Sequence, residues 1–135
     1  MRLFVLAVTI LCAGWQTAQA GVNSYQCLVK EYLSLDNNGA LTRPPNPWPI
    51  GKRFSIDRNT GALVGPEQTL WSTASSKYTV LARGNASNSF SVFITDPAAE
   101  NGMHTTLIKV EEYSSGQTKP FVLLSSSEVA SGTCE

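Results

Sequence analysis

The sequence contains few of the residues from which most catalytic and metal-binding sites are built. It has one histidine, His104, and three cysteines, none of them in a C-x-x-C pair. No serine lies in a G-x-S-x-G nucleophile elbow, and structural zinc sites need several His or Cys ligands. We therefore expect no metal, no cofactor and no enzymatic activity, with His104 in a loop. The catalytic alternative is a small hydrolase in which His104 acts with a serine and Asp96 or Asp57.

The chain also has few charged residues and no excess of either sign. Only 15% of the residues are charged, with 10 basic and 10 acidic side chains, and no run of basic residues occurs. Nucleic-acid binding depends on clustered Lys and Arg that neutralise phosphates. Binding to an anionic membrane surface depends on similar clusters. We expect no nucleic-acid partner, and a membrane surface is disfavoured for the same reason.

Long apolar runs are limited to the beginning of the chain. Arg2 precedes an apolar stretch over residues 3–14, and Ala18-Gln19-Ala20 follows. A basic start, an apolar centre and a small-x-small site are typical of a secretory signal peptide. The stretch is shorter than the ~20 residues that a membrane-spanning helix needs. We expect cleavage after Ala20, export to the periplasm or the extracellular space, and one β-rich domain over residues 21–135 with no membrane anchor.

The cysteines predict a single disulfide bond. Cleavage removes Cys12 and leaves Cys27 and Cys134. In an oxidising compartment, two cysteines in one chain usually form a bridge. This bridge joins the two ends of the domain, so we expect the first and last strands to be neighbours.

Turn residues divide the remaining chain into short strand-like segments. Apolar and polar residues alternate over 54–57, 78–82 and 90–95, and Tyr78, Val80 and Ala82 are expected on one face. Phe93, Leu81 and Leu107 would contribute to a second apolar face. We predict an all-β domain, either a small antiparallel β-sandwich or a meander or barrel of six to seven short strands. Residues 128–134 are expected to pair at an edge.

Two kinds of local signal lie between these strands. Arg58-Asn59-Thr60-Gly61 predicts a hairpin turn with Gly61 in the left-handed conformation and residues 62–64 as the returning strand. Pro66 and the pair Asp96-Pro97 each favour the start of a short helical turn.

The segment over residues 42–50, T-R-P-P-N-P-W-P-I, is the strongest candidate for a binding loop. Its four prolines within six residues favour an extended polyproline II path and exclude a central strand. Trp and Arg are common at interface hot spots. The alternative is a stiff connector whose tryptophan packs on the core. The candidate residues are Arg43, Pro44, Pro45, Trp48 and Ile50.

A second aromatic candidate consists of Trp71 and Tyr78, which flank a stretch rich in Ser and Thr. Such a pair can stack against a sugar ring or a flat ligand. The alternative is that both aromatics fill the core of a small β domain.

These observations predict a secreted or periplasmic, non-enzymatic binding domain, and an inhibitor-like protein-binding module is one form of it. Its partner would be another secreted or periplasmic protein. The main alternative is a small-ligand carrier with a partly open β-barrel. Asn85-Ala86-Ser87 is an N-glycosylation sequon, which matters only in a eukaryotic secretory pathway.

Overall fold

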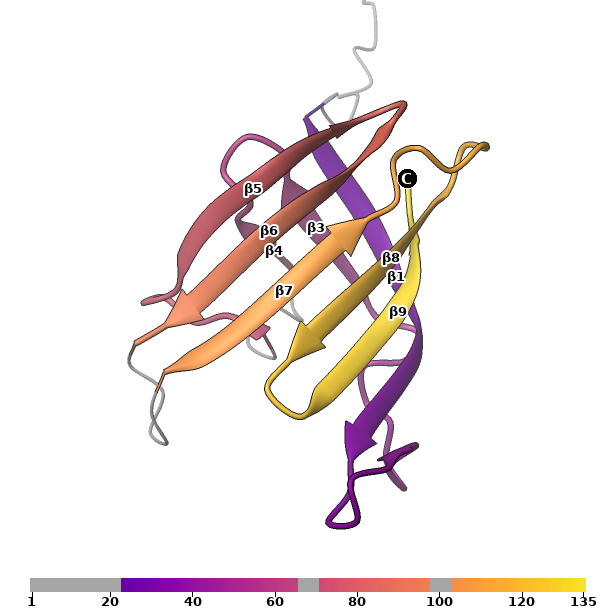
Figure 1. The fold of residues 1–135 in the computed structure, drawn as a ribbon, viewed down its shortest axis with the longest axis vertical. Coiled ribbons are helices and arrows are strands. Elements are labelled where there is room, and N and C mark those ends of the chain that lie inside the picture. The colour runs from indigo at the N-terminus through magenta and orange to yellow at the C-terminus, as the bar shows by residue number, and fades with distance from the viewer. Residues whose placement is uncertain (1–22, 66–70, 98–102) are drawn as a thin grey trace, which may run out of the picture.

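The computed structural model describes residues 23–65, 71–97 and 103–135, which form one curled antiparallel sheet (Figure 1). The predicted signal peptide and both predicted helical turns, apart from Asp96-Pro97, lie outside these residues. No helix in the described part of the chain is long and apolar enough to cross a membrane. The strands are β1 Ser24–Leu35, β2 Leu41–Thr42, β3 Arg53–Asp57, β4 Leu63–Val64, β5 Lys77–Asn85, β6 Asn88–Asp96, β7 His104–Val110, β8 Lys119–Ser125 and β9 Glu128–Cys134.

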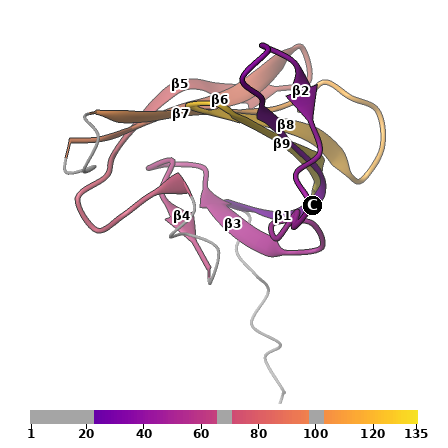
Figure 2. The same cartoon turned by 90° about the horizontal axis from the view of Figure 1, so that it is seen from below.

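The strand order is β4-β3-β1-β9-β8-β7-β6-β5, and β2 pairs with the end of β1. Figure 2 shows that the sheet bends round until β3 and β4 lie across from β5, β6 and β7. The all-β prediction is confirmed. The predicted count of six to seven strands is wrong. The two-residue strand β2 carries too little pattern to be counted, whereas β4 lies within residues 62–64, which were expected to form a strand. A single curled sheet replaces the two sheets of a sandwich.

The last strand lies in the middle of the sheet, so its predicted place at an edge is wrong. β9 pairs with β1 on one side and with β8 on the other. The edge prediction followed from its position at the chain end. The bridge to β1 and the hairpin to β8 instead require two neighbours, and β4 and β5 end the sheet order.

The predicted disulfide joins Cys27 and Cys134 across 107 residues of chain. The two cysteines are direct register partners on β1 and β9, with Cα atoms 4.0 Å apart. Both are fully buried. The expectation that the first and last strands are neighbours is therefore confirmed.

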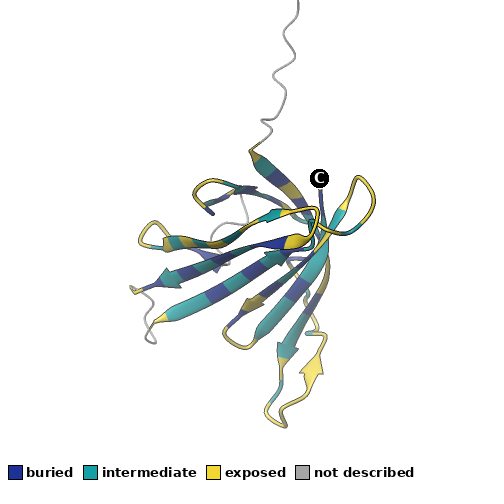
Figure 3. Ribbon diagram, turned by 45° about the horizontal axis from the view of Figure 1, so that its top comes forward, coloured by how far each residue is buried: buried dark blue, intermediate teal, exposed yellow. Residues whose placement is uncertain are grey.

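The inner face of the curled sheet carries the core, because side chains alternate between the two faces of each strand (Figure 3). Phe54 makes edge contacts with Trp71 and with Phe121, each at a ring-centroid distance of 5.4 Å. The hydrophobic core residues are Tyr25, Cys27, Val29, Tyr32, Phe54, Ile56, Leu63, Trp71, Phe90, Val92, Ile94, Ile108, Val110, Phe121, Leu123, Ala130 and Cys134.

The turn between β3 and β4 closes the curl. The Asp57 carboxylate accepts the backbone N–H groups of Asn59 and Thr60, and Gly61 has the predicted left-handed φ of +78°. A Cβ added to Gly61 would lie 2.3 Å from a methyl carbon of Val92 on β6. The hairpin therefore packs directly on the inner face of a strand with which it shares no hydrogen-bond ladder.

Candidate functional site

The predicted proline-rich loop connects β2 to β3 and presents its tryptophan to solvent. Trp48 is 42% exposed, and Lys52 Nζ lies 5.7 Å from the centroid of its ring, within cation–π range. Pro49 is buried and Ile50 packs against the core, so the loop is anchored directly after Trp48. The alternative in which Trp48 packs on the core as part of a stiff connector is therefore wrong.

The first residues of the same loop make few contacts with the rest of the protein. Pro44 is half-buried and Pro45 is exposed. Arg43 Nη2 lies 2.5 Å from Glu31 Oε2, and both side chains are more than half exposed. An exposed ion pair of this kind contributes little to stability, so Arg43 is available to exchange partners.

The two aromatic candidates Trp71 and Tyr78 lie in or beside the core. Trp71 is fully buried against Phe54, and its buried indole Nε1 has no hydrogen-bond partner among the residues that the structure describes. Tyr78 is half-buried and packs on the core from β5. The burial of Trp71 and the core contact of Tyr78 fit a role in packing. Binding of a ligand to these two residues stays a prediction.

The expectation that His104 lies in a loop is wrong, because it is the first residue of β7 and is paired with Asp96 of β6. Its Nε2 lies 3.2 Å from Ser125 Oγ, and that hydroxyl lies 2.8 Å from Thr106 Oγ1. Thr106 and Ser125 are both buried, so the Ser125 hydroxyl belongs to an internal hydrogen-bond network that includes His104 and Thr106.

Asp96 takes part in a separate set of polar contacts at the same end of the sheet. Its two carboxylate oxygens accept the hydroxyls of Thr73 at 2.5 Å and Ser75 at 2.7 Å. A serine nucleophile must also be reachable by substrate, whereas the Ser125 hydroxyl is enclosed. The serine that contacts His104 is therefore not an accessible nucleophile, and the hydrolase alternative stays untested.

The outer face of the sheet carries a continuous line of apolar side chains, which we call the outer row. Adjacent members are direct register partners on five neighbouring strands. They alternate with buried core residues, so they point away from the core. At about 4.8 Å per strand, the outer row spans roughly 19 Å. Its members are Leu33, Val129, Leu124, Leu107 and Phe93.

An apolar groove continues the outer row at the end where β1 and β8 finish. The groove has a volume of about 450 Å³. Leu35, Leu41 and Leu124 line it and are 50%, 49% and 46% exposed. We call it the leucine groove, and its lining residues are Leu35, Gly39, Leu41, Leu124, Ser126, Ser127, Glu128 and Val129.

Sequence reasoning identified part of this surface and missed the rest. Phe93 and Leu107 were expected on a second apolar face, and both lie on the outer face as expected. Leu124 was missed because it follows Phe121, Val122 and Leu123 in an unbroken apolar run that hides the alternation. Only the strand register shows that these side chains form one line.

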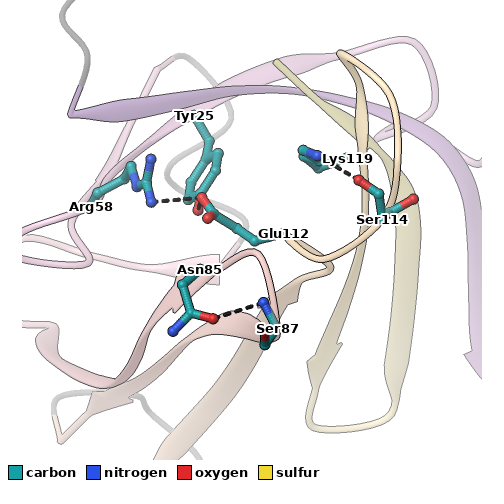
Figure 4. Close-up of polar contacts among 7 residues, drawn as sticks. All are labelled: Tyr25, Arg58, Asn85, Ser87, Glu112, Ser114 and Lys119. Carbon is teal, nitrogen blue, oxygen red and sulfur yellow. Dashed lines mark hydrogen bonds and ion pairs between the residues drawn. The ribbon is translucent and has the colours of Figure 1, made fainter.

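The opposite end of the strands is polar (Figure 4). Glu112 Oε1 accepts the hydroxyl of Tyr25 and lies 2.6 Å from Arg58 Nη2. The guanidinium carbon of Arg58 lies 4.9 Å from the centroid of the Tyr25 ring. Burial, followed by the hydrogen bond to Glu112, raises the pKa of Tyr25 well above its usual value, so its hydroxyl remains a donor. These contacts hold the Arg58 guanidinium in one place.

Two other contacts in Figure 4 order the loops around this cluster. Lys119 Nζ donates to the backbone carbonyl of Ser114 at 2.5 Å, which ties the β7–β8 loop to β8. Asn85 Oδ1 accepts the backbone N–H of Ser87 at 2.8 Å in the β5–β6 turn. The asparagine of the sequon therefore lies in a tight turn.

Comparisons of this chain with family models, with curated proteins and with solved structures found no match. Its function is therefore inferred from the geometry of the two ends and the outer face of the sheet.

Proposed function

We propose that this chain is a non-enzymatic protein-binding module that acts in the periplasm or outside the cell. The outer row and the leucine groove would form its main contact surface. The observation that carries the proposal is the run of five register-paired apolar side chains that leads into a groove lined by three half-exposed leucines. Contiguous exposed apolar surface of this kind marks interaction sites in soluble proteins.

The occupant that fits best is a folded protein that presents a small apolar cluster. The leucine groove has the size to accept a few apolar side chains, and Glu128 is its only ionisable lining residue. Interface cores are depleted in charge and are dominated by such anchored side chains. Ser126, Ser127 and Glu128 would supply the polar rim beside the anchor.

A membrane surface and a second copy of this chain fit less well. The outward residues beside the outer row include one acid, Glu31, and one base, Lys109, whereas anionic membranes attract clusters of basic residues. The outer face is convex (Figure 2), so two copies placed face to face would touch over a small area. A partner with a flat or concave apolar surface can cover more of it.

The loop over residues 43–50 is a candidate for a second contact in the inhibitor-like form of the proposal. This role is supported by the exposure of Trp48 next to Pro49 and Ile50, which pack against the protein and hold the loop in place. The small-ligand carrier has less support, because aromatic side chains fill the described interior of the curl.

The proposal is tested with a photoreactive amino acid placed at position 124, in the oxidised mature protein, in the cells that make it. The matched control carries the same amino acid at position 81, since Leu81 is also exposed but lies on the edge strand β5. We expect one protein to crosslink at 124 and not at 81. Crosslinks only to lipid, only to a second copy, or equally at both positions would overturn the assignment.

A further inference from the structure

A second surface, independent of the outer face, lies at the polar end of the sheet. It is a pocket of about 350 Å³, which is at the lower end of the range for small-molecule sites. We call it the arginine pocket, and its lining residues are Asn23, Arg58, Asn59, Arg83 and Gly84. Two guanidinium groups and two carboxamides are an unusual concentration of hydrogen-bond donors in a chain with few charges.

Arg58 is held in a fixed position in this pocket. Its Nη2 is paired with Glu112, its guanidinium stacks on the Tyr25 ring, and its backbone N–H donates to the Asn23 carbonyl at 2.7 Å. A guanidinium has five N–H donors, so the contact with Glu112 leaves others for a ligand. A donor that is already ordered loses little conformational entropy when a ligand binds.

Arg83 reaches the pocket because of a β-bulge. Strict alternation along β5 would place Ala82 beside Val80 on the inner face, as the sequence predicted, and that prediction is wrong. The register shifts between Val80 and Ala82, so that Arg83 lies opposite the buried Phe90. Bulges of this kind redirect side chains at sheet edges and near functional sites.

Within the described part of the chain, the Arg83 side chain forms no hydrogen bond or ion pair with another residue. The described lining of the pocket carries two positive side chains and no negative one. Glu112 pairs with Arg58, and the Asp57 carboxylate lies on the same turn, where it accepts the backbone N–H of Asn59.

The close packing at Gly84 requires glycine, because a Cβ there would lie 2.8 Å from the Phe90 nitrogen and 3.0 Å from Glu112 Cγ. Its φ of +71° also favours glycine.

We propose that the arginine pocket binds a small hydroxylated anion, such as an acidic or phosphorylated sugar. Guanidinium groups pair with carboxylate and phosphate oxygens in the same forked geometry. The side-chain amides of Asn23 and Asn59 can donate to and accept from neighbouring hydroxyls. The shared chemistry is an oxyanion between Arg58 and Arg83 with hydroxyls beside the two asparagines.

The test is an NMR titration of the oxidised mature protein with D-glucuronate, D-glucose 6-phosphate, inorganic phosphate and neutral D-glucose. We expect one or both sugar anions to shift the side-chain N–H signals of Asn23, Arg58 and Asn59. Each sugar anion that binds should bind more tightly than inorganic phosphate, and glucose should not bind. Tighter binding of glucuronate would assign a carboxylate ligand, and tighter binding of glucose 6-phosphate would assign a phosphate ligand.

Three variants separate the pocket from general charge effects. Arg83→Ala should weaken the tighter sugar anion by about tenfold or more, the loss typical of one charged hydrogen bond. Lys77→Ala removes an exposed cation from the other end of the same strand and should leave binding unchanged. Asn59→Ala should weaken the sugar anions but not inorganic phosphate.

The proposal is overturned if no probe shifts these signals at millimolar concentration, or if Lys77→Ala weakens binding as much as Arg83→Ala does. Binding of inorganic phosphate as tight as that of the sugar anions would remove the role of the two asparagines in recognising hydroxyls. Arg83 is exposed at the sheet edge, so the variant is expected to fold, and near-ultraviolet circular dichroism checks this. None of these outcomes bears on the outer face.

Discussion

Gly61 and Val92 lie in contact although their segments share no hydrogen bonds. A Cβ at Gly61 would be 2.3 Å from Val92 Cγ2 and 3.3 Å from Val80 Cγ2. This contact joins the β3–β4 hairpin to the β5–β6 hairpin across the inside of the curl. Among the described residues, side-chain packing therefore holds β3 and β4 against β5 and β6, and these two pairs of strands share no backbone ladder.

The close contact at Gly61 predicts how much stability is lost when a methyl group is added there. Gly61→Ala should lower the free energy of unfolding by roughly 2–4 kcal/mol, because it adds overpacking to a left-handed backbone. Gly39→Ala is the matched control, since Gly39 has a similar φ of +81° but nothing within 4 Å of the added Cβ. It should cost only about 1–2 kcal/mol. Urea unfolding measures both, and equal losses would show that the contact with Val92 is not tight.

The disulfide makes a second prediction. Replacing Cys27 and Cys134 together by Ala should lower the free energy of unfolding by about 2–5 kcal/mol, because the bridge closes a loop of more than a hundred residues. Urea unfolding of the oxidised and variant proteins gives the difference. The intact mass of the oxidised protein after alkylation should show no free thiol. Two free thiols would contradict the bridge.

Asp57 predicts a pH dependence. Hydrogen bonds from the backbone N–H and then the hydroxyl of Thr60 lower the pKa of Asp57 below its usual value. A lowered pKa stabilises the fold above the unfolded-state value of about 3.9 and stops doing so as the pH falls through the folded-state value. Asp57→Asn should therefore be less stable than the natural chain at pH 7, and the gap should shrink below about pH 4. Thermal unfolding across this range measures it, and a constant gap would rule out the carboxylate as its source.

The sequence predicted those parts of the fold that local chemistry or a covalent bond determines. The Arg58–Gly61 turn follows from turn residues, and the neighbouring positions of the first and last strands follow from Cys27 and Cys134. The place of the last strand at an edge was wrong, because strand order depends on all of its partners. The strand β2 is too short for its alternation to be seen in the sequence.

The candidate surfaces were harder to predict because they depend on register. Trp48 is exposed, which the alternative of a connector with its tryptophan packed on the core does not explain, and its role in binding stays a prediction. The outer row needs five strands to be aligned to the residue, and no single segment shows this. Arg83 needs the bulge between Val80 and Ala82, which breaks the alternation that the sequence suggests. Bulges of this kind leave no signal in the pattern of apolar residues.

The measurement that tests the central claim most directly is the affinity of the crosslinked partner for two variants, measured by calorimetry with the purified proteins. Leu124→Glu places a charge in the leucine groove, and Leu81→Glu places the same charge on a similarly exposed leucine of β5. Both should keep the stability of the natural chain within about 1 kcal/mol, as surface changes usually do. We predict that Leu124→Glu weakens binding by at least about thirtyfold, a hot-spot loss of 2 kcal/mol, while Leu81→Glu has no effect. Unchanged affinity with Leu124→Glu would contradict the account.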